Sequence, residues 1–133
     1  MVRGMREIKF RAWNAPLKKM DYSPLNAVGF DGKVYYGNAD ITGFFENIMQ
    51  YTGLKDKNGR EIYEKDIAEE SYINPMTGKK VVDRYVIEWE NGIHKMKYIG
   101  DQKGMDRYLW MRLDEIEVIG DVYRNPDLLE EAE

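Results

Sequence analysis

The first regular pattern along the chain is an alternation of apolar and polar positions from Ile8 to Trp13. Successive side chains of a β-strand point to opposite faces, so this alternation predicts a half-buried strand. One face would carry Ile8, Phe10 and Ala12, and the other Lys9, Arg11 and Trp13. We expect the first face to pack on a core and the cationic face to lie in water.

The rest of the first half predicts short strands and one helix. Asp31-Gly32 is a hairpin signal between two apolar runs, Val28–Phe30 and Val34–Tyr36. From Asp40 to Gln50 the apolar positions follow helical spacing behind a fair N-cap, which favours a short helix that passes into a strand at about Met49. We therefore predict a small α+β unit over residues 1–63. Residues 1–4 are expected to be disordered, because Met5 is a natural start.

The second half predicts five short strands joined by tight turns. Asn58-Gly59 precedes them, and Asn91-Gly92 closes the hairpin of the strongest strand. Such a set buries its faces by curling into a small barrel or a strongly bent sheet. Asn125-Pro126 supplies an N-cap and an N1 proline, so we predict a short C-terminal helix. The fold class is mainly β (α+β), with the second unit over residues 64–133. The predicted strands are Asp66–Ala68, Val81–Glu90, Ile93–Ile99, Tyr108–Leu113 and Glu117–Tyr123.

Composition limits the class of protein. The 133 residues are 43% hydrophobic and 33% charged, which is typical of a soluble globular chain. There is no apolar run of about 18 residues, no export signal and no cysteine, so we expect a cytoplasmic protein with no membrane contact. Residues 1–60 carry ten Lys and Arg against six Asp and Glu, whereas residues 61–133 carry ten against eighteen. This asymmetry favours an acidic partner for the first part or head-to-tail pairing of copies, and solvated surfaces explain it as well.

Three blocks of sequence resemble the YopX family, in the family's order and over nearly the whole chain. They are Met5–Trp13, then Gln50–Gly59 with Glu61–Glu64 and Asp66-Ile67, and finally Glu117–Gly120 with Asn125-Pro126 and Leu128-Leu129. The resemblance implies a small protein of bacteriophages or prophages without an established activity, and a C-terminal part similar to an SH3-like barrel. Family members usually have Gly where this chain has Lys65, which indicates that residue 65 needs no positive φ here.

Groups that could carry catalysis are sparse, and we expect neither an enzyme nor a bound cofactor or metal. His94 is the only histidine, and it has no nucleophile or set of metal ligands in its pattern. Glu88 and Glu90, like Glu115 and Glu117, would share a strand face with Lys and Arg on neighbouring strands, which suits cross-strand ion pairs. Gly100 to Gly104 lacks the sequence of a phosphate-binding loop and is expected to be a flexible connector.

Two functions remain open from the sequence. The first is a non-enzymatic accessory protein that forms homo-oligomers and binds an unknown phage or host protein, since Tyr, Met and Trp are abundant. Trp89 and Trp110 are expected in the core, and Trp13 is the better interface candidate. The alternative is a nucleic-acid-binding module, because cations interleaved with an aromatic residue can contact phosphates and stack a base, although the pI of about 5.2 opposes it. The candidate binding residues are Arg6, Lys9, Arg11, Trp13, Lys18 and Lys19.

Overall fold

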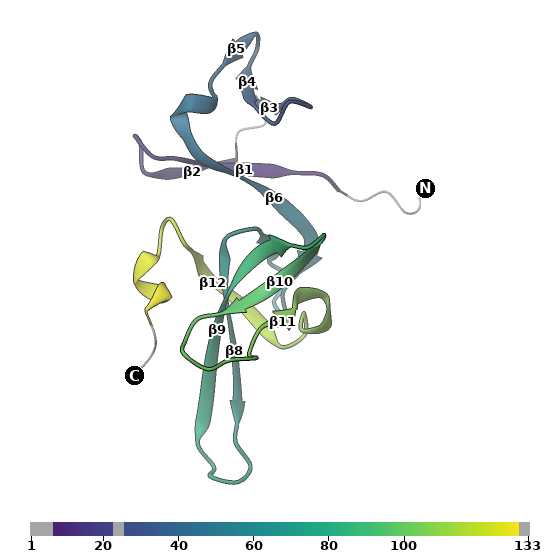
Figure 1. The fold of residues 1–133 in the computed structure, drawn as a ribbon, viewed down its shortest axis with the longest axis vertical. Coiled ribbons are helices and arrows are strands. Elements are labelled where there is room, and N and C mark those ends of the chain that lie inside the picture. Colours follow the sequence, from purple (N-terminus) through teal and green to yellow (C-terminus); the bar gives the residue numbers. More distant parts are fainter. Residues whose placement is uncertain (1–6, 23–25, 131–133) are drawn as a thin grey trace. The chain divides into compact units, whose positions relative to one another are not determined.

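The protein is mainly β, and its computed structural model describes residues 7–22 and 26–130 (Figure 1). The predicted disorder of residues 1–4 therefore lies outside the described residues. The chain divides into two compact units, residues 1–51 and residues 52–133. The sequence predicts a boundary at 63/64. The observed division falls inside one long strand, β6 (Phe45–Lys55), which the sequence interpretation had begun only at about Met49.

In the first unit, β1 (Phe10–Asn14) is a central strand. It pairs antiparallel with β2 (Lys19–Asp21) on one side and with the first part of β6 on the other. The order of this sheet is β2-β1-β6-β7, and β7 (Glu61–Tyr63) follows in the second unit. A separate antiparallel sheet has the order β3-β4-β5, built from β3 (Asn26–Val28), β4 (Val34–Tyr36) and β5 (Ala39–Asp40). The hairpin signal at Asp31-Gly32 thus lies where it was expected.

The helix predicted over Asp40–Gln50 is wrong. Asp40 accepts hydrogen bonds from the backbone N–H and the hydroxyl of Thr42, and this turn leads into a single 3-10 turn, η1 (Thr42–Phe44). From Phe45 onward the backbone is extended, because Ile48 and Met49 pair with β1. Tertiary pairing has overridden a weak helical pattern that already contained Gly43. The described part of the first unit is therefore not α+β.

The second unit is a curled five-stranded antiparallel sheet in the order β11-β10-β9-β8-β12. β12, the last strand along the chain, pairs with β8, the first strand of this sheet along the chain. Its strands are β8 (Asp66–Ile73), β9 (Lys80–Glu90), β10 (Ile93–Tyr98), β11 (Arg107–Tyr108) and β12 (Ile116–Asp121). The inward-facing core comprises Ile62, Ala68, Tyr85, Ile87, Met96, Leu109, Ile116 and Val118. The distal part of the β8–β9 hairpin projects beyond the rest of this sheet (Figure 1).

Two predicted elements of the second unit are shorter than expected. The strand predicted over Tyr108–Leu113 is β11 followed by a 3-10 turn, η2 (Leu109–Met111). The C-terminal helix is a 3-10 turn, η3 (Pro126–Leu129), with Pro126 at its start. The Asn125 side chain does not cap η3, because its Oδ1 accepts a hydrogen bond from the Asp121 backbone N–H at 3.2 Å.

The turn at Asn58-Gly59 is fastened by Asp56, which is 6% exposed. Asp56 Oδ1 accepts the backbone N–H groups of Asn58 and Arg60, both at 2.9 Å, and Gly59 has a φ of 80°. Asp56 Oδ2 accepts the N–H of Val118 at 2.8 Å, and the Arg60 guanidinium donates to the Val118 carbonyl at 2.9 Å. The central block of the sequence therefore holds β12 where its register shifts next to Val118.

Lys65 has a φ of 70°, so the expectation that residue 65 needs no positive φ is wrong. Its backbone N–H donates to the Ile87 carbonyl, and its carbonyl accepts from Val122 N–H. These two hydrogen bonds hold Lys65 in the left-handed conformation, which is unfavourable for residues other than glycine.

Lys65→Gly is expected to be more stable than Lys65→Ala by about 1 kcal/mol. Both substitutions remove the Lys65–Glu88 ion pair, so the difference between their free energies of unfolding reports the cost of the left-handed backbone conformation. Urea unfolding of the two variants measures it. An alanine variant as stable as the glycine variant would contradict the left-handed conformation.

Candidate functional site

The face of β1 that was expected in water is buried, and Ala12 on the other face is buried as well, so both faces of the strand are covered from Arg11 to Asn14. Arg11 is 3% exposed and Trp13 is 8% exposed, whereas Ile8 on the opposite face is 64% exposed. Trp13 is the largest apolar side chain of this strand, whereas the exposed Ile8 lies before the strand and Phe10 is its first residue. The alternation carries Arg11 inward with it, where its Nη1 lies 3.3 Å from the Tyr22 hydroxyl. The expected exposure of Arg11, and of Trp13 as an interface residue, is therefore wrong.

The other predicted binding residues do not form one continuous cationic surface in the described structure. Lys9 is ion-paired with Glu7 at 3.2 Å, and its ammonium lies 5.0 Å from the centre of the Tyr51 ring. Lys18 and Lys19 are exposed at the turn between β1 and β2. Arg6 lies outside the described residues. Among the described members of this set, Lys18 and Lys19 are therefore the exposed cations, and the Lys9 side chain is one-third exposed.

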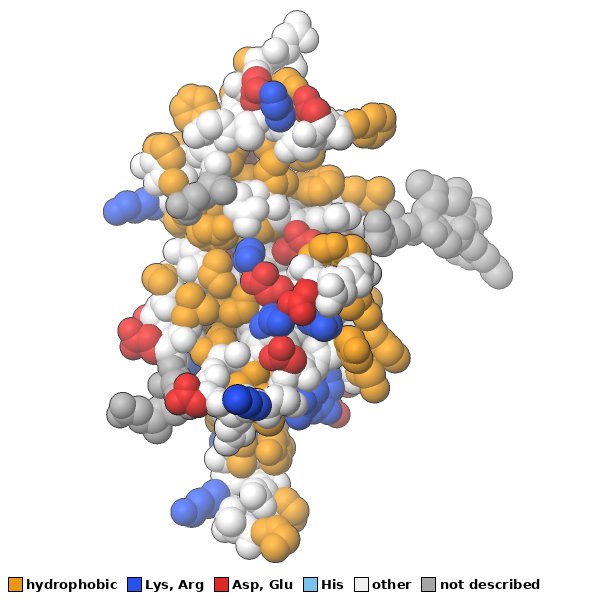
Figure 2. Space-filling view, viewed as in Figure 1, with side chains coloured by type: hydrophobic (Ala, Val, Ile, Leu, Met, Phe, Trp, Pro, Cys, Tyr) orange, Lys and Arg blue, Asp and Glu red, His pale blue; other side chains and the backbone are white. Residues whose placement is uncertain are grey.

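The outer face of β9 and β10 carries the predicted cross-strand ion pairs. Lys65 Nζ lies 2.8 Å from Glu88, and Glu90 is bound by Lys97 at 2.7 Å and by Lys95 at 3.4 Å. The hydrogen bond from Lys97 lowers the pKa of the Glu90 carboxyl and, in return, raises the pKa of Lys97. Acidic and basic side chains are interspersed over these strands (Figure 2). On this face the carboxylates are paired with lysines, so it does not carry an excess of charge of one sign.

Of the other two carboxylates expected to pair across strands, Glu115 is paired with a cation three residues earlier in the chain, and Glu117 stands opposite another carboxylate. Glu115 lies 2.9 Å from Arg112, and Glu117 stands opposite Glu69, which is paired with Arg84 at 3.2 Å. Within residues 7–22 and 26–130, no group of three His, Cys, Asp or Glu side chains could hold a metal ion.

His94 is part of a local pair rather than a catalytic constellation. Its Nε2 lies 3.1 Å from Glu64 Oε2, and its ring meets the edge of the Trp89 ring at a centroid distance of 4.7 Å. The His94 and Glu64 side chains are 13% and 20% exposed. This arrangement joins the start of β10 to the segment after β7.

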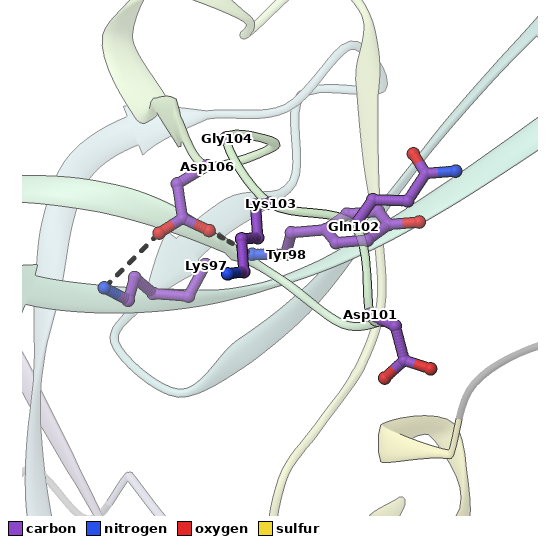
Figure 3. A pocket seen from close by; sticks show the side chains of 8 residues that line it. Lys97, Tyr98, Asp101, Gln102, Lys103, Gly104 and Asp106 are labelled. Atoms are coloured by element: carbon purple, nitrogen blue, oxygen red, sulfur yellow. Dashed lines mark hydrogen bonds and ion pairs between the residues drawn. The ribbon is translucent and has the colours of Figure 1, made fainter.

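An open hollow of about 480 Å³ lies under the loop between β10 and β11 (Figure 3). Asp106 lies between two groups, since it accepts the Tyr98 N–H at 2.8 Å and lies 3.4 Å from Lys97 Nζ. Asp101 points away from these residues in the same view. The charges of Lys97 and Asp106 are satisfied by each other and by Glu90, and Lys103 is the other cation that lines the hollow.

Exposed aromatic side chains gather instead at β11 and η2. We call Tyr108, Trp110 and Met111 the η2 surface; their exposed fractions are 47%, 59% and 60%. Leu109, which is fully buried, is the residue of this segment that enters the core. The expectation that Trp110 and Trp89 are core residues is wrong, since Trp89 is also 56% exposed. Because a 3-10 turn interrupts the predicted strand, period-two alternation gives the wrong side for Trp110, and no other sequence signal marked it.

The comparison with protein families agrees with the three blocks of sequence. The family described as YopX protein matches residues 9–130. The chain belongs to the YopX family. The crystal structure of protein EF1440 from Enterococcus faecalis is similar to this YopX protein, with 26% sequence identity and a TM-score of 0.56. The match covers 95% of this chain and 100% of that one. No curated protein matches the chain. In the part of the chain that the structure describes, no helix is long and apolar enough to cross a membrane.

Proposed function

We propose that this YopX protein is a non-enzymatic, cytoplasmic accessory protein of a bacteriophage or prophage that acts through self-association and contacts with a phage or host protein. The observation that carries the proposal is the η2 surface, where two aromatic side chains and a methionine lie in water. Such side chains are enriched in the cores of protein interfaces and dominate binding energy when they are covered. The second unit is small, so assembly adds apolar burial that the monomer lacks.

We also propose that the second unit is a small SH3-like barrel. Two features support this. β12, the last strand along the chain, pairs with β8, the first strand of the sheet, and the 3-10 turn η2 lies between β11 and β12. A barrel of this kind serves as a scaffold, and its binding residues lie in the connections between strands. The η2 surface is such a connection.

The self-association proposal predicts a dimer or larger oligomer whose dissociation constant rises at least about tenfold in the double variant Trp110→Ala/Met111→Ala. Size-exclusion chromatography with light scattering across a concentration series measures it. Met76→Ala is the matched control, because Met76 is 90% exposed at the tip of the β8–β9 hairpin and lies outside the η2 surface. A strict monomer at about 50 µM contradicts self-association.

The alternative function, nucleic-acid binding, rests on the exposed turn between β1 and β2. Lys18 and Lys19 are available there to contact phosphates, whereas the buried Arg11 and Trp13 offer no stacking platform. In this alternative the two lysines contact the phosphates of the nucleic acid.

If the alternative holds, Lys18→Ala/Lys19→Ala reduces the slope of log affinity against log salt by about 2 for a labelled oligonucleotide. The control Lys79→Ala/Lys80→Ala removes two exposed lysines from the β8–β9 hairpin and leaves that slope unchanged. No salt-sensitive binding of single- or double-stranded DNA at about 50 mM salt rules this alternative out.

A further inference from the structure

A buried pair of acidic residues lies on the inner face of the second unit's sheet, where the β8–β9 hairpin leaves the other strands (Figure 1). Glu70 and Asp83 are direct register partners, and they are 7% and 9% exposed. Directly opposed residues in an antiparallel pair point to the same side of the sheet. Two carboxylates side by side and shielded from water are costly unless cations or hydrogen-bond donors meet them.

The compensation for this pair is incomplete. Arg112 is shared between two carboxylates, since its Nη2 lies 3.1 Å from Glu70 Oε1 and its Nη1 lies 2.9 Å from Glu115 Oε2. The second oxygen of Glu70, Oε2, is buried and has no hydrogen-bond partner among the described residues, and the same holds for Arg112 Nε. Burial raises the pKa of the Glu70 carboxyl, with Asp83 and Glu115 adding to the effect against the attraction of Arg112 and Arg107. Glu70 therefore holds an acceptor that the described fold does not use.

Glu70 lines an open hollow of about 430 Å³ together with Lys57, Ser71, Tyr72, Asp114 and Glu115. Three carboxylates line the hollow with the Lys57 ammonium, and the Arg112 guanidinium pairs with two of them, so one negative charge is left uncompensated and favours a cationic group. The described carboxylates do not form a set that could hold a metal ion. The cationic group that fits the hollow is therefore an ammonium or guanidinium, which donates N–H hydrogen bonds. The half-exposed Tyr72 ring offers apolar and π surface to the stem of such a group.

The strand beside this hollow has an open edge. β12 begins at Ile116 opposite Glu70, so in the described part of the chain Ser71–Ile73 is paired with β9 and has no strand on its other side. An extended segment can add to such an edge through backbone hydrogen bonds. A side chain of that segment would then stand next to Glu70.

We propose that this hollow binds a lysine or arginine side chain of a partner protein, presented on an extended segment that pairs with Ser71–Ile73. The cation lies between the exposed carboxylates of Asp114 and Glu115 and reaches the Glu70 side chain where that side chain lines the hollow. The inference rests on the proposed function only in that the ligand belongs to a protein. The hollow and the η2 surface use different residues.

The test uses a labelled peptide of alternating lysine and threonine, and the same peptide with every lysine acetylated. Fluorescence anisotropy with the full chain should show that acetylation weakens binding at least about tenfold. Glu70→Gln should weaken the unmodified peptide by a similar factor, and the backbone amide signals of Ser71–Ile73 should shift on titration. The matched control is Glu117→Gln, which removes the same charge from an exposed position on β12 and should change affinity less than about twofold.

Equal binding by the wild type, Glu70→Gln and Glu117→Gln overturns the proposal, and so does the absence of binding at about 1 mM peptide. If Glu70→Gln does not fold, Asp114→Asn/Glu115→Gln replaces it, since both residues are exposed on the rim of the hollow. This double variant should weaken the peptide by at least about threefold, and an unchanged affinity overturns the proposal. Light scattering on Glu70→Gln separates the two proposals, because loss of peptide binding with intact self-association shows that the hollow binds the peptide independently of self-association.

Discussion

Replacing Asp56 with alanine is expected to destabilise the second unit by about 3–4 kcal/mol. The carboxylate is buried and accepts three backbone N–H groups, two within its own turn and one from Val118. Alanine leaves all three donors without this acceptor. Hydrogen bonds to a charged acceptor contribute more than neutral ones, and a buried donor that loses its partner adds a desolvation cost.

The Val118 contact explains why the effect should spread beyond the turn. It joins the residue-56 turn to β12, at the place where the register between β12 and β8 shifts. A bulge leaves backbone groups outside the regular ladder, so they need another partner. Asp56 and Arg60 supply partners for both the N–H and the carbonyl of Val118.

Urea unfolding of Asp56→Ala measures the loss, and amide hydrogen exchange at Val118 identifies its location. Asp56→Asn keeps an oxygen for the turn but places an NH2 group against one of the donors, so it should fall between the wild type and alanine. Asp101→Ala is the control, because Asp101 is exposed in a loop, and it should change stability by less than about 0.5 kcal/mol. A loss below about 1 kcal/mol for Asp56→Ala would show that the carboxylate does not hold β12.

Trp13→Ala is expected to cost the first unit about 3–5 kcal/mol. Trp13 is 8% exposed on a central strand that has neighbours on both sides, so its removal leaves a cavity that the sheet cannot close. Arg11 lies on the same face and is 3% exposed.

The comparison variant is Trp110→Ala, whose ring is 59% exposed and whose loss should change stability by less than about 1 kcal/mol. Circular dichroism and denaturant unfolding follow both variants. The result that would contradict the described orientation of β1 is the reverse ranking, with Trp13→Ala mild and Trp110→Ala severe. That ranking would restore the original expectation for the two tryptophans.

The local features predicted from the sequence are those that depend on near neighbours. Asn58-Gly59, Asn91-Gly92 and Asp31-Gly32 all lie at turns, because positive φ at a glycine is a property of the residue itself. The mainly β class and the cross-strand ion pairs of Glu88 and Glu90 followed from period two, which fixes which side chains share a face.

Period two does not say which of the two faces is buried. In β1 both faces are buried, with Ala12 on one and Trp13 on the other, and Arg11 lies inside against the ordinary preference of a charged residue. In the segment after β11 a 3-10 turn broke the period, so Leu109 entered the core and Trp110 did not. Neither outcome was available from the residues of the segment alone.

The sequence by itself determined the YopX family, the turns and the mainly β character of this protein, because these depend on residues close together in the chain. Only the tertiary structure decided that Phe45–Lys55 is a strand, that Lys65 adopts a left-handed conformation, and that Glu70 stands opposite Asp83. Each of these is set by partners distant in sequence: β1 for the long strand, Ile87 and Val122 for Lys65, and the β8–β9 register for the acidic pair. The free energy of such long-range pairing exceeds the weak local preference of the segments involved, and for that reason local pattern could not reveal them.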